Sequence, residues 1–423
     1  MFRNILGLLL LTGFLTNSQA QQNTDSLRLT LPEAEKIFLQ KNLDLLSQQY
    51  NIDINKALEQ QAKYWDNPTL STDQNIYDGK FFRHTTINGQ PYGQIYLQLQ
   101  QVIKTAGKRN KLIKLAQDQT LTATQQLNDL LRNLKYVLTT DFTSLQQLMN
   151  TYSLYSNEIA STQKLAAGMD AELQAGNISQ KDNLRIKALL YSLQSDQSDA
   201  LMQMADMQKE LHVLLQQNDT TIIVPVLNNP GDAPALTLAQ LLDSARNNRP
   251  DLQLAKTNLL VQQHNLSYQK ALAVPDVTVG IEYDHASSYA PNVWGLTVGL
   301  PIPVLNKNKG NINAAGIAVK QANTGILQTQ IQVEQDVTGA YNKFLIANRL
   351  KNSLSPDLHE KYDTLLRNVM QSYQQRQIGL IEFIDFFDAY KDSYLKKLQL
   401  EATLRNTAAE LNFTTGTSII TIQ

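Results

Sequence analysis

Three acidic side chains recur at steps of three residues near the C-terminal end of the chain: Glu382, Asp385 and Asp388. Side chains three apart share one face of an α-helix, so the carboxylates of Glu382 and Asp385 are expected side by side. Grouped carboxylates can attract cations. A charge run is more often a solvated helix face, and the residues alone leave both interpretations open.

The chain offers little other chemistry. It has no Cys, which excludes disulfides, thiolate metal sites and Cys nucleophiles, and no two of its five His share a metal-ligand spacing. Met202, Met204 and Met207 could bind Cu(I) through their thioethers, but their helical spacing favours core filling. With no nucleophile–base pair and no Gly-rich phosphate loop, the sequence predicts no enzyme, no cofactor and no metal site.

Composition and the N-terminus bound the class of protein. The 423 residues carry a net charge of -1, so charge gives no reason to expect a nucleic-acid partner. Residues 1–20 read as a signal peptide, with Arg3 before the apolar run Ile5–Leu15 and a small-x-small site at Ser18–Ala20. We expect the mature chain to start at Gln21 and, since no Cys stands there, to lack a lipoprotein anchor.

The sequence repeats itself once. The triplet Leu29–Leu31 recurs as Leu236–Leu238 at an offset of 207, and the same offset relates Pro68 to Pro275. This predicts a first unit over residues 21–218, a proline-containing linker over 219–235 and a second unit over 236–423.

Each unit is predicted to contain a helix, two strands and a long helical hairpin. The first helices are expected over 32–64 and 238–273, the strands over 68–77, 93–103, 275–284 and 292–300, and the long helices over 108–167 and 311–374. Pro356 should interrupt the second long helix. Return helices are expected to run to Leu215 and Leu411.

The stretch Trp294–Gly316 shows the strand pattern most clearly. Apolar residues alternate with Gly and Thr up to Pro301 and Pro303, which cannot donate to a ladder. The alternation predicts one apolar face across the strands: Ile95, Leu97, Leu99, Val277, Val279, Ile281, Trp294, Leu296, Val298 and Leu300. The pattern alone fits a membrane strand and an ordinary soluble sheet equally well.

The two long helices turn back at short breaks. The first break precedes Ser179 and Asp182, whose spacing matches a capping box. The second break runs over 375–379, with Glu382 in the first turn of the return helix, where an acid suits the helix dipole.

These motifs, taken in order, resemble the TolC family of outer-membrane efflux proteins over essentially the whole mature chain. The matching stretches are LTLPEAEKIFLQKNLDL, WDNPTLS, QVIKTAGKRN, LPIPVLNKNKGNINAA and YQQRQIGLIEFIDFFDAY. The fourth of them looks most like the branch that serves heavy-metal and cation pumps of the resistance-nodulation-division type.

The resemblance implies a mixed α and β fold that is completed by trimerisation. Four strands per chain would build one shared twelve-stranded transmembrane β-barrel, continued by a long α-helical coiled-coil tunnel across the periplasm. Four strands cannot close a barrel, and an open sheet in lipid leaves backbone groups unpaired. The apolar face would then meet lipid, while Gln94, Gln98, Gln100, Thr278 and Glu282 would line water.

The resemblance also assigns roles to the acids and the helical turns. It implies that Glu382 and Asp385, with Asp388 beside them, form a periplasmic gate of carboxylate rings that favours cations. Arg376 departs from the Gly that relatives often carry there. The turns correspond to adaptor-docking tips: Gly176, Asn177, Ile178, Ser179, Asp182, Gln377, Ile378 and Gly379.

The expected function is a passive exit duct of a tripartite efflux pump in the outer membrane of a Gram-negative bacterium. The expected partners are two further copies of the chain, a periplasmic adaptor, an inner-membrane resistance-nodulation-division pump and outer-membrane lipid. The cargo would be metal cations or small toxic compounds. A soluble periplasmic coiled-coil adaptor or scaffold is the alternative, and the strands discriminate between the two.

Overall fold

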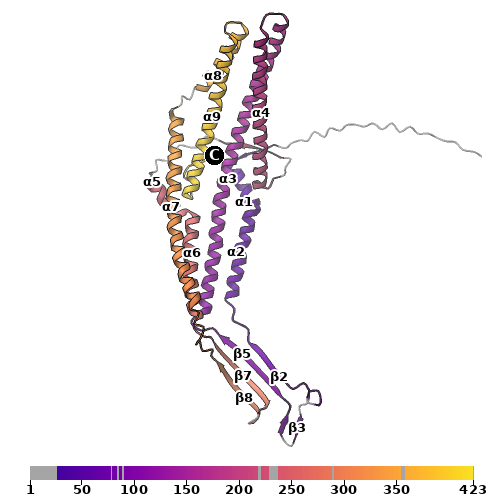
Figure 1. The fold of residues 1–423 in the computed structure, drawn as a ribbon, viewed down its shortest axis with the longest axis vertical. Coiled ribbons are helices and arrows are strands. Elements are labelled where there is room, and N and C mark those ends of the chain that lie inside the picture. The colour runs from indigo at the N-terminus through magenta and orange to yellow at the C-terminus, as the bar shows by residue number, and fades with distance from the viewer. Residues whose placement is uncertain are drawn as a thin grey trace, which may run out of the picture.

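The computed structural model describes residues 26–77, 79–82, 85–87, 90–217, 221–227, 237–287, 290–353 and 358–422. The predicted signal peptide, residues 1–20, lies outside these ranges. The protein is elongated, with its helices at one end and a sheet at the other (Figure 1). Across the described ranges, we find no helix with the length and apolar character needed to span a membrane.

The elements in chain order are β1 (Ser26–Thr30), α1 (Leu31–Lys41), α2 (Leu43–Ala62), β2 (Thr69–Gln74), β3 (Thr85–Ile87), β4 (Gln90–Tyr92), β5 (Ile95–Ile103), α3 (Lys108–Gln174), α4 (Gln180–Leu215), β6 (Ile222–Val226), α5 (Leu238–Asn248), α6 (Pro250–Leu272), β7 (Val277–Ala286), β8 (Pro291–Gly299), α7 (Lys309–Ser353), α8 (Leu358–Gln374) and α9 (Leu380–Thr415).

The single helix predicted at the start of each unit is wrong, because each is two helices. The breaks fall at Asn42 and Arg249, which are related by the same offset of 207. Asn42 ends α1 in an extended conformation, and its Oδ1 accepts the backbone N–H groups of Asp44 and Leu45 at 3.0 and 3.1 Å. Arg249 is extended because the following Pro250 disfavours a helical conformation before it.

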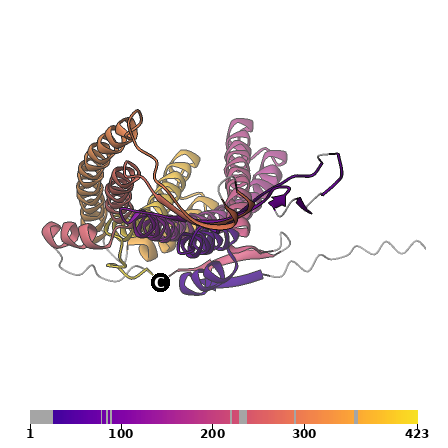
Figure 2. The same cartoon turned by 90° about the horizontal axis from the view of Figure 1, so that it is seen from below.

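The long helices form the body of the molecule. α3 has 67 residues and is about 100 Å long at a rise of 1.5 Å per residue. It packs against α2, α4, α6 and α9. The predicted second long helix is interrupted as expected, since α7 ends at Ser353 and α8 begins at Leu358, although Pro356 itself lies outside the described residues. Seen from below, the helices stand side by side in a layer (Figure 2).

Three apolar clusters hold this layer together. In each half, a short helix packs on a long helix and its return helix: Phe38 of α1 shares a cluster with Phe142 of α3, and Leu241 of α5 shares one with Phe344 of α7. The third cluster joins the two hairpins to each other through side chains such as Ile186 and Phe387. Burial between the hairpins therefore fixes their spacing near the turns.

The four predicted strands are confirmed as one antiparallel sheet in the order β2–β5–β7–β8. Two further pairings were not predicted: β1 lies parallel to β6, and β3 pairs with β4 in a hairpin. β6 lies inside the segment 219–235 that we expected to be only a linker.

Candidate functional site

One face of the sheet carries most of its large apolar side chains. Pairing places Leu97 opposite Tyr283, and Ile281 between Leu99 and Leu296. The register puts these predicted residues on that face: Ile95, Leu97, Leu99, Val277, Val279, Ile281, Trp294, Leu296 and Val298. Leu300 follows the end of β8. Trp294 and Leu296 are each 72% exposed, so the protomer itself does not cover this face.

The opposite face of the sheet is a polar network. The Tyr96 hydroxyl donates to Glu282 Oε2 at 2.7 Å, and Gln98 Nε2 lies 3.4 Å from both Glu282 Oε2 and Thr297 Oγ1. Nearer the turn between β7 and β8, Gln94 Nε2 donates to Asp284 Oδ1 at 3.2 Å. These contacts join β5, β7 and β8 through groups that water can also solvate, as the prediction of a water-lined face requires.

Two glycines make room for this polar face. A Cβ at Gly295 would lie 2.7 Å from Glu282 Oε1, and one at Gly280 would lie 2.6 Å from Thr297 Oγ1. Real Cβ atoms do not approach polar atoms so closely, so glycine lets the Glu282 side chain lie flat along the sheet. This explains the glycine at position 295 of β8 and the one at position 280 of β7.

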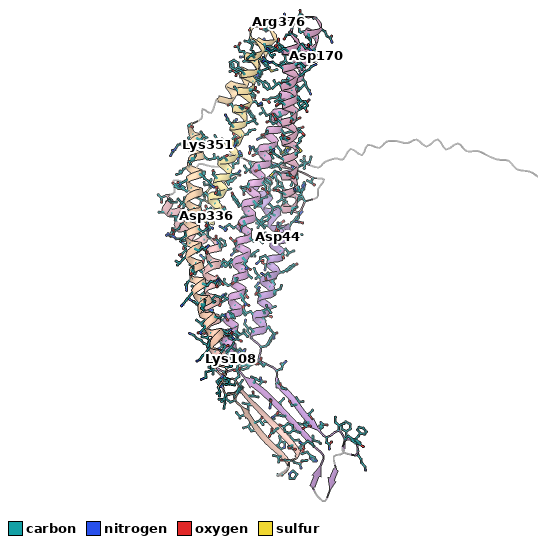
Figure 3. The ribbon with its side chains drawn as sticks, in the orientation of Figure 1. Asp44, Lys108, Asp170, Asp336, Lys351 and Arg376 are labelled. Atoms are coloured by element: carbon teal, nitrogen blue, oxygen red, sulfur yellow. The ribbon has the colours of Figure 1, made fainter. Side chains whose placement is uncertain are left out.

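Ion pairs fix the junction between sheet and helices. Lys108, labelled in Figure 3, is buried and its Nζ lies 2.6 Å from Asp276 Oδ1. The Thr105 backbone N–H donates to the same carboxylate at 2.8 Å. Lys104 Nζ lies 2.9 Å from Asp66 Oδ1, and the Arg109 guanidinium stacks over the Trp65 ring at 4.7 Å. Several of these cations therefore have partners within the protomer.

The two helical turns share one backbone motif. Gly176 and Arg376 both adopt the left-handed conformation, with φ of 74° and 58°. The next backbone N–H then bonds back to a carbonyl five residues earlier: Asn177 to Glu172 at 2.9 Å, and Gln377 to Ser372 at 2.8 Å. Arg376 thus occupies the place of a glycine, as the sequence suggested, without changing the turn.

The return helices begin at equivalent positions. Ser179 Oγ accepts the Asp182 N–H at 3.1 Å, so the N-cap half of the predicted capping box is present, and it donates to Asp182 Oδ2 at 2.7 Å. Gly379 stands at the same place before α9. Ile178 and Ile378 both pack against the cluster that joins the hairpins, so each turn is held onto its neighbour.

A carboxylate links the two turns directly. Glu172 Oε2 accepts from Asn177 Nδ2 at 2.9 Å in its own turn and from Arg376 Nη2 at 2.5 Å in the other. Arg376 and Asp170, labelled in Figure 3, lie at the same end of the molecule. Asp170 pairs with Lys187 at 2.7 Å, a hydrogen bond that lowers the pKa of Asp170. An ion pair between Glu172 and Arg376 thus joins the two turns.

The three predicted gate acids lie on α9. Glu382 and Asp385 are exposed, on the side of the helix away from Phe383 and Phe387, which are buried. Asp388 is partly buried and lies 3.3 Å from Lys391 Nζ. The structure therefore groups Glu382 with Asp385 and places Asp388 in an ion pair.

A groove of about 440 Å³ runs between α3 and the pair α8 and α9. Glu158 lies in its wall, is 4% exposed, and among the described residues neither of its carboxyl oxygens has a hydrogen-bond partner. Burial raises the pKa of Glu158 to about 8, with Asp388, Asp196 and Asp392 adding to the rise and Lys391 opposing it. The sequence analysis did not identify this residue.

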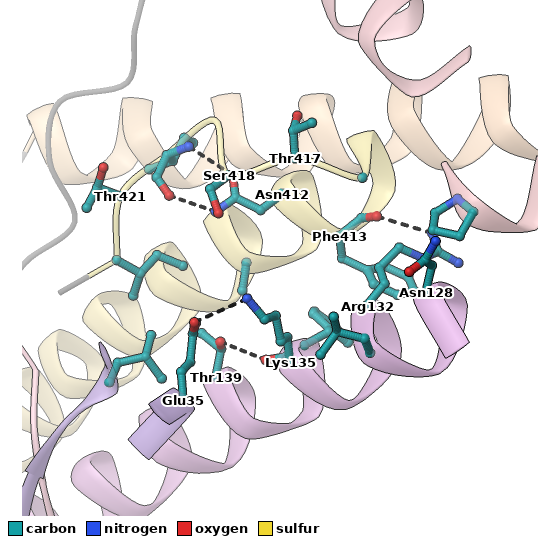
Figure 4. A pocket seen from close by; sticks show the side chains of 18 residues that line it. Glu35, Asn128, Arg132, Lys135, Thr139, Asn412, Phe413, Thr417, Ser418 and Thr421 are labelled. Carbon is teal, nitrogen blue, oxygen red and sulfur yellow. Dashed lines mark hydrogen bonds and ion pairs between the residues drawn. The ribbon is translucent and has the colours of Figure 1, made fainter. Parts of the chain in front are cut away.

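A second pocket, of about 370 Å³, lies between α3, the end of α9 and the C-terminal tail (Figure 4). Its charged groups are paired: Lys135 Nζ lies 3.3 Å from Glu35, and Arg132 donates to the Phe413 carbonyl at 3.2 Å. Nearby, Arg249 binds Asp251 and Asp336 and reaches the Thr414 carbonyl. Two arginines thus neutralise the carbonyl end of α9, which is a structural role.

Within the described ranges, no group of three or more His, Asp or Glu side chains is arranged to hold a metal ion. Met204 and Met207 pack against the cluster of Phe38 and Phe142, whereas Met202 is exposed, so the core-filling role holds for two of the three methionines.

Comparison with known proteins identifies the architecture. Residues 241–416 match the family model described as outer membrane efflux protein. The chain thus matches this family through its second half. It is 20% identical over 376 residues to the cobalt-zinc-cadmium resistance protein CzcC of Cupriavidus metallidurans, which covers 89% of this chain and 84% of that protein.

Solved structures of transmembrane channels share the fold. A crystal structure of CusC superposes with a TM-score of 0.73 at 15% identity and covers 92% of each chain. The CmeC outer membrane channel of Campylobacter jejuni gives a TM-score of 0.73 at 14% identity, covering 92% of this chain and 86% of that one. The TolC-like fold is thereby confirmed.

The family match and the shared fold together support an outer membrane efflux protein. The family is one of outer-membrane channels and not of enzymes, which argues against the soluble periplasmic adaptor that the sequence left open. Family channels work as trimers within tripartite pumps.

Proposed function

We propose that three copies of this chain form the exit duct of a tripartite efflux pump. The observation that carries the proposal is the sheet, which is apolar on one face, polar on the other and open at both edges. Among the described residues, β2 pairs only with β5, and β8 only with β7. An open edge in lipid leaves backbone donors and acceptors unpaired, and joining β8 of one copy to β2 of the next removes every edge.

The helices support the same assembly. α2 carries a stripe of exposed apolar side chains at steps of three and four residues: Leu43, Leu46, Tyr50, Ile54 and Leu58. α7 exposes Ile317, Leu327 and Ile331. The two helices lie on opposite sides of the layer (Figure 1), so copies can associate side by side and close a ring.

We propose metal cations as the cargo and a periplasmic adaptor with a resistance-nodulation-division pump as the partners. The name of CzcC, a cobalt-zinc-cadmium resistance protein, supports this choice of substrate class. Exposed Glu382 and Asp385 would form carboxylate rings at the periplasmic mouth, and the turns around Gly176 and Gly379 would dock the adaptor.

Purification tests the assembly. The mature protein, extracted from outer membranes in a mild detergent, is expected to have the mass of three chains by light scattering with the detergent contribution subtracted. Recovery in the soluble periplasmic fraction without detergent, or a monomer in detergent, would contradict the duct.

A further inference from the structure

Residues 300–305, which we call the apolar loop, connect β8 to the start of α7. Leu300, Ile302 and Val304 continue the alternation of the apolar sheet face beyond the last paired residue of β8. Ile302 is 79% exposed, Val304 71% and Leu305 100%. Such a run of exposed large apolar side chains is unusual in water and marks a contact surface.

The backbone of the loop is constrained at several points. Pro301 and Pro303 fix two backbone φ angles, and the Val304 N–H donates to the Ile302 carbonyl at 2.8 Å across Pro303. The apolar side chains are therefore presented by a stiff backbone. Little conformational entropy is lost when a stiff loop is buried by another surface.

The far end of the loop is anchored to α6. Asn308 adopts a left-handed conformation with φ of 55°, and its Nδ2 donates to the Gln269 carbonyl at 2.8 Å. Its backbone N–H also bonds Asn306 Oδ1 at 3.0 Å. The end of the loop next to α7 is therefore fixed to α6.

Cationic side chains follow the loop at once. Lys307 and Lys309 are exposed, and they stand at the same junction where Lys104 and Lys108 are already paired with Asp66 and Asp276. An apolar segment next to exposed lysines matches the order of acyl chains and anionic headgroups across a membrane interface.

We propose that the apolar loop inserts into the periplasmic leaflet of the outer membrane, with Lys307 and Lys309 at anionic phospholipid headgroups. The first half of the chain has no equivalent, since its turn at 104–107 is short and contains one aliphatic side chain, that of Ala106. Each chain therefore contributes one such loop. The inference requires only an outer-membrane location and is independent of what the duct exports.

Spin labelling tests the insertion, because the chain has no native Cys. Ile302→Cys, Val304→Cys and Leu305→Cys would each carry a nitroxide in the full-length mature protein. The protein would be reconstituted in vesicles of phosphatidylethanolamine and phosphatidylglycerol. Tyr191→Cys on α4 is the matched control in the helical region, because Tyr191 is 76% exposed, between Val304 and Ile302. All four sites are exposed, so the labels should leave the fold intact.

The measurement is the rate at which each nitroxide collides with two reagents. Oxygen partitions into lipid, and a nickel chelate stays in water. Insertion predicts a higher oxygen-to-nickel ratio at 302, 304 and 305 than at 191. It also predicts that Lys307→Gln with Lys309→Gln lowers this ratio only when phosphatidylglycerol is present. Low collision with both reagents would mean that a second copy covers the loop, and high collision with nickel would mean that water does; either result overturns the proposal.

Discussion

At the scale of single residues, Glu158 is the most unusual group in the helical part of the protein. It is a carboxylic acid held between two helical hairpins, and its oxygens have no hydrogen-bond partner among the described residues. A buried carboxylate is costly unless paired, so the neutral form is favoured and the pKa rises to about 8.

This pKa predicts a pH-dependent stability. The pKa of Glu158 in the folded protein lies above its ordinary value of 4.5. The folded state is therefore stabilised fully below pH 4.5, where Glu158 is protonated, and this stabilisation is lost as pH rises through about 8. Between pH 6 and pH 9, we expect the free energy of unfolding of the purified protein to fall by an amount on the order of a few kcal/mol. The fall would be measured as a lower thermal midpoint at the higher pH. Glu158→Gln should remove most of this slope, and an equal slope in both proteins would contradict the burial argument.

Val298 and Thr297 are neighbours in β8 with opposite surroundings. Val298 is 65% exposed on the apolar face, while Thr297 Oγ1 faces Gln98 on the polar face. If lipid covers the apolar face, Val298→Arg should cost about 2–4 kcal/mol near mid-membrane, and Thr297→Arg should cost much less. Assembly would be followed by the heat resistance of the trimer on gels. Equal damage from both changes would mean that lipid does not cover one face alone.

Single residues also show where the sequence was informative. The alternation in β8 identified its apolar face because side chains in a strand must alternate. Glu158 could not be found that way, since it stands next to Ile159 in a helical pattern and its burial depends on α8 and α9, which lie about 200 residues away in the chain. Arg249 carried a usable signal, because Pro250 follows it.

At the scale of elements, the turn before α9 offers a clean test of adaptor docking. At Gly379, φ is -81° and an added Cβ meets no atom within 4 Å, so a side chain fits without disturbing the protomer. Gly379→Trp should therefore leave folding and trimers intact but abolish efflux, measured as metal tolerance of cells. Gly379→Ser is the matched control and should keep efflux. Normal tolerance with Gly379→Trp would remove this turn from the adaptor surface.

The elements that the sequence missed are short or depend on distant partners. β6 and β1 pair across almost 200 residues, and neither strand is stable without the other. The breaks at Asn42 and Arg249 interrupt helical patterns that periodicity alone reads as continuous. The long helices and the four sheet strands were predictable, because their patterns extend over many residues.

At the scale of the whole molecule, two similar halves form one layer. Each half contributes a broken short helix, two strands and a helical hairpin, in keeping with the predicted duplication over 21–218 and 236–423. The pairing of β1 with β6 and the apolar cluster that joins the two hairpins make the division less sharp than a simple linker suggests. The duplication itself remains a prediction.

Two acids of α9 bear on the assembled mouth of the duct. Glu382 and Asp385 are exposed on one side of α9, within about two turns of the tip that ends at Gly379. Three copies around an axis would bring these like charges together, where a narrow passage strengthens their field. Asp388 contributes less, because Lys391 already neutralises it.

Glu382→Gln with Asp385→Asn should therefore widen or loosen the mouth and lower the preference for cations. Single-channel recording of the purified trimer in a planar bilayer measures both, as conductance and as the reversal potential under a salt gradient. Asp388→Asn is the matched control, and its effect should be smaller because only a paired charge is lost. If the double variant conducts and selects like the unaltered trimer, these carboxylates are ordinary surface charges and the constriction lies elsewhere in the tunnel.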